Sequence, residues 1–150
     1  MNRERPRRNP PDGPRSARHW LVKQEPESYS WEAFESDGRA VWDGVRNYQA
    51  RNHLKGMRIG DRVLFYASGA IRSVVGIAAV ARAAYPDPTA EEPGWVAVEL
   101  QAVRGVERPV SLAQIRAAPA LAGVALLRNS RLSVMPLARG EFERIVRMGG

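Results

Sequence analysis

Two long apolar runs, separated by a short turn, constrain the fold more than any other feature of the sequence. The run 61–68 carries apolar side chains on both faces, which is typical of a strand in the middle of a sheet. The run 73–84 is rich in β-branched residues and contains Gly76. A glycine inside a strand usually marks a bulge or the close approach of another group, and either would suit a sheet that curls into a barrel.

Shorter elements are predicted on both sides of these runs. Further strands are expected at 19–23, 39–42, 95–103 and 131–135. Helices are expected at 31–35 with Ser30 as the N-cap, at 47–57, from the N-cap Ser111 to Pro119, and around Phe142, Ile145 and Val146. The helices do not alternate regularly with the strands. The pattern therefore predicts an α+β fold, an open β-barrel of about five or six strands with short flanking helices, and not a parallel α/β sheet.

The first 18 residues differ in composition from the rest of the chain. They contain six arginines, two acidic residues, four prolines and almost no apolar side chains, so residues 1–18 are predicted to be a disordered arm and residues 19–150 the ordered domain. The arm holds four of the seven excess positive charges. It is either a non-specific phosphate-binding tail or an extension without function. The overall basicity favours an acidic partner such as nucleic acid, although a coding bias toward arginine would produce the same excess.

Several classes of protein are not indicated by the sequence. The absence of cysteine excludes a disulfide framework and a thiolate metal site, and His19 and His53 show no metal-ligand spacing. No apolar run approaches the roughly 20 residues that span a bilayer. We therefore expect a soluble cytoplasmic protein, able to associate with the nucleoid, that is a monomer by default and has no membrane partner, metal or cofactor.

The stretch 42–52 concentrates side chains that recognise flat polar ligands. It contains Asn47, Gln49 and Asn52, three of the nine side-chain amides in the chain, beside two aromatic residues and two arginines. Planar amides and guanidinium groups pair with the edges of bases, and aromatic rings stack on their faces. The alternative is a buried turn that leads into a short helix, with Trp42 in the core and the amides capping backbone groups.

Six segments stand in order along the predicted domain: Trp-Leu-Val-Lys-Gln-Glu-Pro (20–26), Trp-Asp-Gly-Val-Arg-Asn-Tyr-Gln-Ala-Arg-Asn (42–52), Gly-Asp-Arg-Val-Leu-Phe-Tyr-Ala-Ser (60–68), Val-Val-Gly-Ile-Ala (74–78), Ala-Tyr-Pro-Asp-Pro-Thr-Ala (84–90) and Arg-Leu-Ser-Val (131–134). In this order the chain closely resembles the EVE domain of the PUA-like superfamily, from about His19 to the C-terminus. The resemblance implies a PUA-like barrel that binds nucleic acid, either DNA or RNA. It also implies a pocket for a flipped modified base, such as 5-methylcytosine or a further oxidised cytosine, in a reader and not an established catalyst.

The resemblance also assigns residues to that pocket, namely Lys23, Gln24, Trp42, Val45, Arg46, Asn47, Tyr66 and Ser68. Two positions depart from the family pattern. Gln24 replaces the usual serine, and Ala67 stands where histidine is frequent. If either residue lines the pocket, the preferred modification would differ from that of better-known members.

Physical chemistry suggests roles for these residues. Trp42 and Tyr66 could clamp a base between their rings, at about 1–3 kcal/mol per stacked base, which is comparable with the few kcal/mol that base flipping costs. Asn47 and Ser68 could read the Watson–Crick edge. The alternative for Tyr66 is packing in the core.

Phosphates could be held by Arg46 and Arg51, although Arg46 could equally be solvated or ion-paired. Two other functional classes stay open. An enzyme resembling the related ASCH domains, which include an amidohydrolase acting on acetylated cytidine, could use Lys23, Glu25, Tyr66 and Ser68, provided that the pKa of Lys23 is lowered. The third class is a protein-interaction module that binds no nucleic acid.

Overall fold

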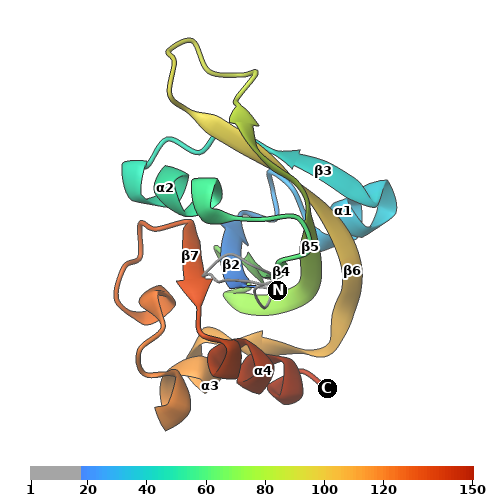
Figure 1. The fold of residues 1–150 in the computed structure, drawn as a ribbon. Coiled ribbons are helices and arrows are strands. Elements are labelled where there is room, and N and C mark those ends of the chain that lie inside the picture. Colours follow the sequence, from blue (N-terminus) through green and yellow to red (C-terminus); the bar gives the residue numbers. More distant parts are fainter. Residues whose placement is uncertain (1–17) are drawn as a thin grey trace, which may run out of the picture.

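Six strands form one sheet in the order β3-β6-β5-β4-β2-β7, which curls around a single core (Figure 1). The computed structural model describes residues 18–150, so the predicted arm, apart from Arg18, lies outside the described residues. The strands are β2 (His19–Gln24), β3 (Arg39–Trp42), β4 (Arg62–Ala67), β5 (Ser73–Pro86), β6 (Val96–Ser111) and β7 (Val134–Leu137). The helices are α1 (Trp31–Asp37), α2 (Tyr48–Gly56), α3 (Leu112–Ala117) and α4 (Arg139–Met148), with 3-10 turns η1 (Pro119–Leu121) and η2 (Ala125–Leu127). All neighbouring strands are antiparallel except β2 and β4.

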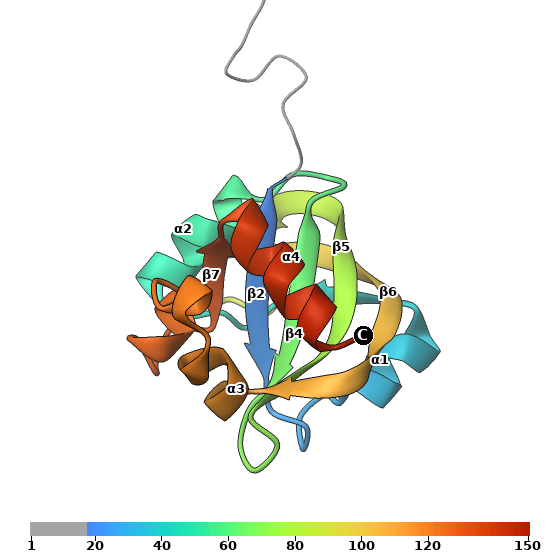
Figure 2. The same cartoon turned by 90° about the horizontal axis from the view of Figure 1, so that it is seen from below.

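An aromatic cluster fills the inside of the curled sheet. Phe34 of α1 is fully buried and lies 5.8 Å from the ring of Trp42 and 5.9 Å from that of Phe65. The other face of the sheet is covered by α4, which crosses β2 and β4 in Figure 2. There the ring of Phe142 lies 4.6 Å from that of His19. The predicted open barrel with short flanking helices is confirmed.

Gly76 lies at a bulge of β5 and in close contact with an aromatic ring, which are the features that a glycine inside a strand predicts. The register between β4 and β5 shifts between Phe65 and Tyr66, so β5 bulges beside Gly76. The ring of Trp31 also packs directly on this glycine, because a Cβ at position 76 would lie 2.5 Å from three of the ring atoms.

Gly76→Ala is expected to lower the free energy of unfolding by about 1–3 kcal/mol, because an added methyl group overpacks the core against Trp31. Urea unfolding measures the change. Gly140→Ala is the matched control, since nothing lies within 4 Å of a Cβ at that position of α4. Equal stability of Gly76→Ala and the unmodified protein would contradict the observed packing.

Two strands differ from their predicted ranges. The strand predicted at 95–103 continues to Ser111 and passes through Pro109. Proline is tolerated there because β3 pairs only with residues 98–101 of β6, which leaves one side of the later residues without a partner strand. The strand predicted at 131–135 begins only at Val134, because the Asn129 side chain accepts a hydrogen bond from the Arg131 N–H and holds this segment in a turn.

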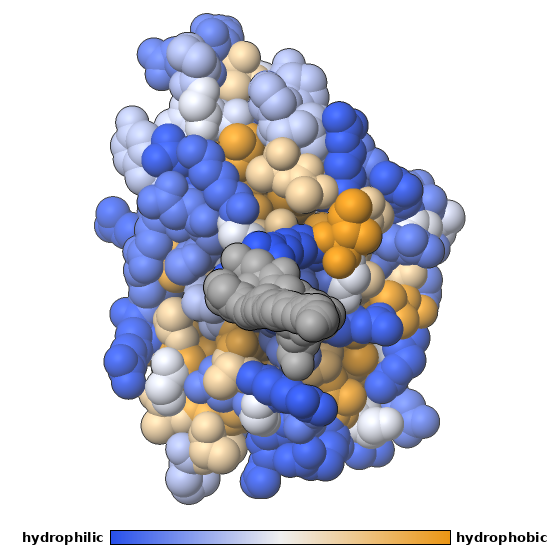
Figure 3. Space-filling model, viewed as in Figure 1, coloured by the Kyte–Doolittle hydropathy of each residue, from blue (hydrophilic) through white to orange (hydrophobic). Residues whose placement is uncertain are grey.

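Hydrophobic side chains are scattered on one face of the molecule. On the face shown in Figure 3, hydrophobic side chains form small separate patches among hydrophilic ones. Among residues 18–150, no helix is long and apolar enough to cross a membrane.

Candidate functional site

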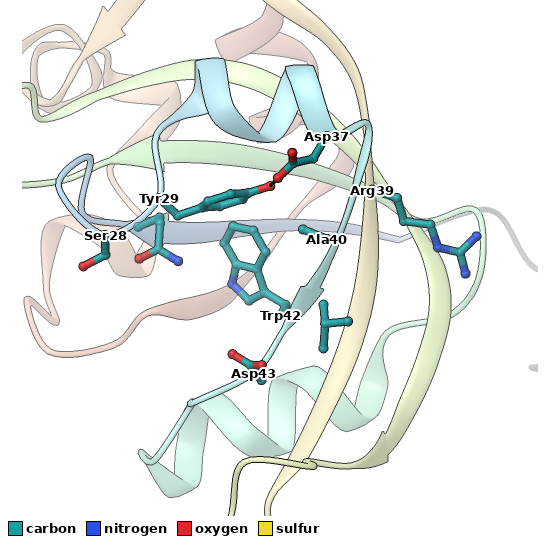
Figure 4. A pocket seen from close by; sticks show the side chains of 9 residues that line it. Ser28, Tyr29, Asp37, Arg39, Ala40, Trp42 and Asp43 are labelled. Atoms are coloured by element: carbon teal, nitrogen blue, oxygen red, sulfur yellow. Dashed lines mark hydrogen bonds between the residues drawn. The ribbon is translucent and has the colours of Figure 1, made fainter.

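A pocket of about 520 Å³ opens where β2 ends, beside β3 and the loop that leads into α1 (Figure 4). It is lined by Gln24, Ser28, Tyr29, Asp37, Arg39, Ala40, Val41, Trp42 and Asp43. Small-molecule sites have volumes of roughly 300–1,000 Å³. The pocket is therefore large enough for a planar ring system such as a nucleobase.

Trp42 forms the wall between the pocket and the core. Its side chain is 5% exposed, and its ring makes edge contacts with Phe65 at 5.8 Å and with Tyr29 at 6.3 Å. The interpretation of Trp42 as a core residue is therefore confirmed, and the same ring also lines the cavity, while its binding of a base stays a prediction.

The indole N–H of Trp42 is a hydrogen-bond donor at the pocket wall. No residue among those described accepts a hydrogen bond from its Nε1–H. In Figure 4 this nitrogen is turned toward the space between Ser28 and Asp43. A hydrogen-bond acceptor on a ligand bound in the pocket could therefore pair with this N–H.

Gln24 and Asp43 are among the other polar residues that line the pocket. The Oε1 atom of Gln24 accepts the Glu25 N–H at 3.1 Å, which fixes the amide and leaves its NH₂ group to donate. Asp43 is exposed at the mouth, and its carboxylate can only accept hydrogen bonds when it is ionised. Trp42 and Gln24 thus supply donors and Asp43 an acidic acceptor to a pocket that Ser28, Asp37 and Arg39 also line.

Tyr29 was missed by the sequence analysis, although its position carries a signal. It precedes Ser30, the N-cap of α1, and its ring packs 6.0 Å from that of Phe34 in the manner of a hydrophobic staple. Its hydroxyl donates a hydrogen bond to Asp37 Oδ2 at 2.7 Å. Burial and this hydrogen bond raise the pKa of Tyr29 to about 12, so the phenol stays neutral.

Asp87 was also missed, and it holds the loop that follows Trp42. This buried carboxylate accepts hydrogen bonds from the Gly44 N–H at 2.8 Å, from Arg46 Nη1 at 2.9 Å, and from the backbone and hydroxyl of Thr89. Burial alone would raise the pKa of Asp87, but the hydrogen bonds from Thr89, Gly44 and Arg46 outweigh burial and lower it well below its usual range. The Pro-Asp-Pro-Thr sequence is a turn signal, but it indicates only a loop and not the bonds of Asp87 to Gly44 and Arg46.

The model of the EVE domain matches residues 18–148. The chain belongs to the EVE domain family. The resemblance seen in the sequence is thus confirmed, and it covers nearly the whole described part of the chain.

Relatives of this EVE domain include proteins from animals and bacteria. Human thymocyte nuclear protein 1 is 32% identical over 162 residues, which cover 85% of the chain and 72% of the human protein. Its structure in complex with DNA that contains 5-methylcytosine has a TM-score of 0.82 at 31% identity, covering 89% of this chain and 98% of that one. Protein Atu2648 from Agrobacterium tumefaciens gives a TM-score of 0.87 at 42% identity, with 89% and 94% covered. An ASCH protein from Zymomonas mobilis, with a TM-score of 0.56 at 15% identity over 89% and 96% of the two chains, shares the fold.

The predicted clamp of Trp42 and Tyr66 is wrong for this EVE domain. Phe65 contacts Trp42, and successive side chains of a strand point to opposite faces of the sheet, so Tyr66 points away from the pocket. The phenol is buried on that other face, where burial raises its pKa while the charges of Arg72 and Arg116 act against the rise. Both faces of β4 are apolar, so the sequence pattern could not show which face meets Trp42.

Lys23 lies on the same face as Tyr66. The two residues are partners in the parallel register of β2 and β4, and the Lys23 ammonium donates a hydrogen bond to the Ser130 carbonyl at 2.9 Å. Burial lowers the pKa of Lys23, as an enzymatic base would require. However, a catalytic site built on Lys23 would lie on the opposite face of the sheet from the pocket that Gln24 lines.

Three other predicted residues do not line the pocket of this EVE domain. Asn47 is the N-cap of α2, where its Oδ1 accepts the Ala50 N–H at 2.9 Å, as the alternative interpretation of the amides proposed. The Ser68 hydroxyl donates to the Gln24 carbonyl at 3.3 Å and fastens the ends of β4 and β2 together. Val45 packs against the core.

The two predicted phosphate-binding arginines lie beside the pocket and not in it. Arg46 is ion-paired with Asp87, which was the alternative given for this residue. The Arg51 guanidinium lies 5.0 Å from the ring centroid of Tyr48 and 5.6 Å from that of Trp95. Of the predicted site residues, the structure therefore brings only Gln24 and Trp42 together in this pocket.

Proposed function

We propose that this EVE domain binds DNA and accommodates a flipped cytosine, modified at its C5 position, in the pocket beside Trp42. Human thymocyte nuclear protein 1, a relative with the same fold, has been crystallised with DNA that contains 5-methylcytosine. This supports DNA as the polymer and a modified cytosine as the ligand of the present chain.

The observation that carries the proposal is the set of polar groups in the pocket. The Watson–Crick edge of cytosine has one amino donor at N4 and two acceptors at N3 and O2. Among the polar residues that line the pocket, Asp43 can accept from the N4 amino group and the Trp42 indole can donate to N3 or O2, while the Gln24 amide is left for the substituent at C5. Thymine and uracil present a carbonyl where cytosine has its amino group, and the Asp43 carboxylate would repel that oxygen.

The modification itself supplies little affinity through apolar contact. Burying one methyl group contributes about 0.8 kcal/mol, which is close to fourfold in affinity. Stronger selectivity needs a polar partner for an oxidised substituent. Gln24 stands where the resemblance implies a serine, and its longer side chain brings an amide donor to the pocket. We therefore propose that oxidised cytosines are preferred over 5-methylcytosine.

A binding panel tests this function. Single- and double-stranded oligonucleotides, of DNA and of RNA, would carry cytosine, 5-methylcytosine, its hydroxymethyl and formyl derivatives, or thymine (uracil in RNA) at one position. A preference of tenfold or more for an oxidised cytosine in DNA is the expected result. Equal affinity for all members of the panel would refute the reader function.

Asp43→Asn should reduce the discrimination between modified cytosine and thymine by about tenfold or more, because an amide can turn its NH₂ group toward the thymine oxygen. The ratio of the two dissociation constants measures the effect. Glu35→Gln is the matched control, since it removes the same charge from an exposed position on α1 outside the pocket. An unchanged ratio in Asp43→Asn would exclude Asp43 as a reader of the base edge.

Removal of residues 1–17 should weaken binding to all sequences alike and make affinity less dependent on salt. These residues contain five arginines, and contacts between arginine and phosphate carry no sequence information. The slope of log affinity against log salt should fall by up to about one unit per lost phosphate contact. A changed ratio between modified and unmodified probes would instead make the arm part of the reader.

A further inference from the structure

A second aromatic surface lies at the start of α2, outside the pocket lining, and has no role in the function proposed above. Tyr48, the first residue of α2, stacks on Trp95, which directly precedes β6. Their ring centroids are 5.0 Å apart, and the ring planes differ by 27°. Tyr48 is nevertheless 67% exposed, so most of its surface stays open to solvent. We call this pair the Tyr48–Trp95 stack.

Two arginines border the Tyr48–Trp95 stack, and they differ in their partners. Arg46 lies 5.5 Å from the ring centroid of Trp95 but is ion-paired with Asp87. The Arg51 guanidinium lies over both rings. Within the described part of the chain, it donates its hydrogen bonds to the neutral side chain of Asn52. Arg51 therefore keeps a positive charge that no described carboxylate neutralises at ion-pair distance.

The acidic residues near the stack limit the path of a polyanion. A cavity of about 430 Å³ beside Trp95 is lined by Arg46, Thr89, Glu91, Glu92 and Trp95. The two glutamates disfavour a phosphate in this cavity, since like charges repel. A phosphate is favoured instead at Arg51.

The stack is joined to the pocket through a short, fixed loop. Trp42 lines the pocket, Tyr48 begins α2, and the residues between them are held by the bonds of Asp87 to Gly44 and Arg46. Tyr48 lies six positions after Trp42, which limits the distance between their Cα atoms to about 20 Å. A single strand that places one base in the pocket can thus reach the stack within a few nucleotides.

We propose that the Tyr48–Trp95 stack binds a second base of the same DNA strand, next to or near the flipped cytosine, with the adjoining phosphate at Arg51. The proposal rests on the DNA-binding function proposed above and extends it to a neighbouring nucleotide. Stacking on an exposed aromatic ring accepts any base, because every base has a π-face. The stack therefore adds affinity and fixes the position of the strand, and the pocket supplies selectivity.

Abasic substitution tests the proposal. The probe is a single-stranded DNA nonamer with one central 5-methylcytosine, and single abasic sites replace each of the other positions in turn. One flanking position should lose roughly 5- to 150-fold in affinity, which corresponds to about 1–3 kcal/mol for one stacked base. Tyr48→Ala should lose the same factor on the intact probe and should show no further loss at that abasic position.

Two variants serve as controls for this experiment. Tyr48→Phe keeps the aromatic face and should restore wild-type affinity. Gln49→Ala alters the next exposed residue of α2 and should change nothing. Equal affinities of the wild-type protein and Tyr48→Ala for the intact probe would overturn the proposal.

The outcome also separates this proposal from the reader function. A coupling between Tyr48 and one flanking base, without any preference for modified cytosine, would support the stack and refute the reader pocket. A clear preference for modified cytosine with additive losses in Tyr48→Ala and the abasic probes would refute the stack and leave the reader function intact.

Discussion

Trp42→Ala is expected to lower the free energy of unfolding by about 3–5 kcal/mol and to abolish selective binding of modified cytosine. The stability loss follows from the removal of a large ring that is almost fully buried among Phe34, Phe65 and Tyr29. The binding loss follows because the same ring forms a wall of the pocket. Urea unfolding and the oligonucleotide panel measure the two effects separately.

Trp42→Phe distinguishes the role in the core from the role in the pocket. The phenyl ring retains much of the aromatic packing but has no N–H, so a ligand acceptor loses its donor and affinity should fall by about five- to 150-fold. Trp31→Phe is the matched control, because it makes the same change in the same cluster outside the pocket lining. Wild-type affinity in a folded Trp42→Phe protein would remove the indole N–H from the binding site.

Asp87→Ala is expected to cost about 3 kcal/mol of stability. The change leaves the Gly44 N–H and the Thr89 groups without their acceptor and the Arg46 guanidinium without its counter-charge. Loss of one partner from a buried ion pair costs about 3–5 kcal/mol. The lower end applies because the Arg46 side chain is 39% exposed and solvent can screen its charge. Chemical denaturation measures this loss. Stability equal to that of the unmodified protein would contradict the role of Asp87.

The lowered pKa of Asp87 also predicts how stability depends on pH. Since the folded-state pKa lies below the ordinary value of 3.8, the contribution of Asp87 is complete well above pH 3.8 and is lost as the pH falls below it. Asp87→Asn should therefore show a smaller loss of stability between pH 6 and pH 3 than the unmodified protein. Glu92→Gln changes an exposed carboxylate in the same connection and should retain the full loss. An unaltered pH dependence in Asp87→Asn would contradict the carboxylate's role.

The sequence predicted correctly those features that depend on residues close together in the chain. The N-caps at Ser30 and Ser111 and the strand at 39–42 were predicted correctly, because capping and strand alternation act over a few residues. The family resemblance could be recognised in the sequence because each of its motifs is a contiguous segment.

The site was only partly predictable, because its residues meet through long-range pairing. The orientation of Tyr66 depends on which face of β4 meets β3 across the curled sheet, and two apolar faces conceal that choice. Asp87 acts on Gly44 from another strand connection, and the sequence carries no mark of that distant hydrogen bond. Tyr29 is placed in the pocket by the cap of its own helix, which is a local pattern. Its position was therefore easier to predict than the role of Asp87.

The parallel pairing of β2 with β4 has a consequence for how the chain acquires its structure. The hairpins that join β4, β5 and β6 bring together residues close in sequence, whereas His19 of β2 pairs with Arg62 on one side and with Leu137, near the opposite end of the chain, on the other. Closing large loops costs entropy before any contact repays it, so such pairings form late and slowly. During synthesis the β4–β6 meander can form as soon as it leaves the ribosome. The pocket at the end of β2 is also lined by β3, which pairs with β6, so the pocket can form only after β6 has been synthesised.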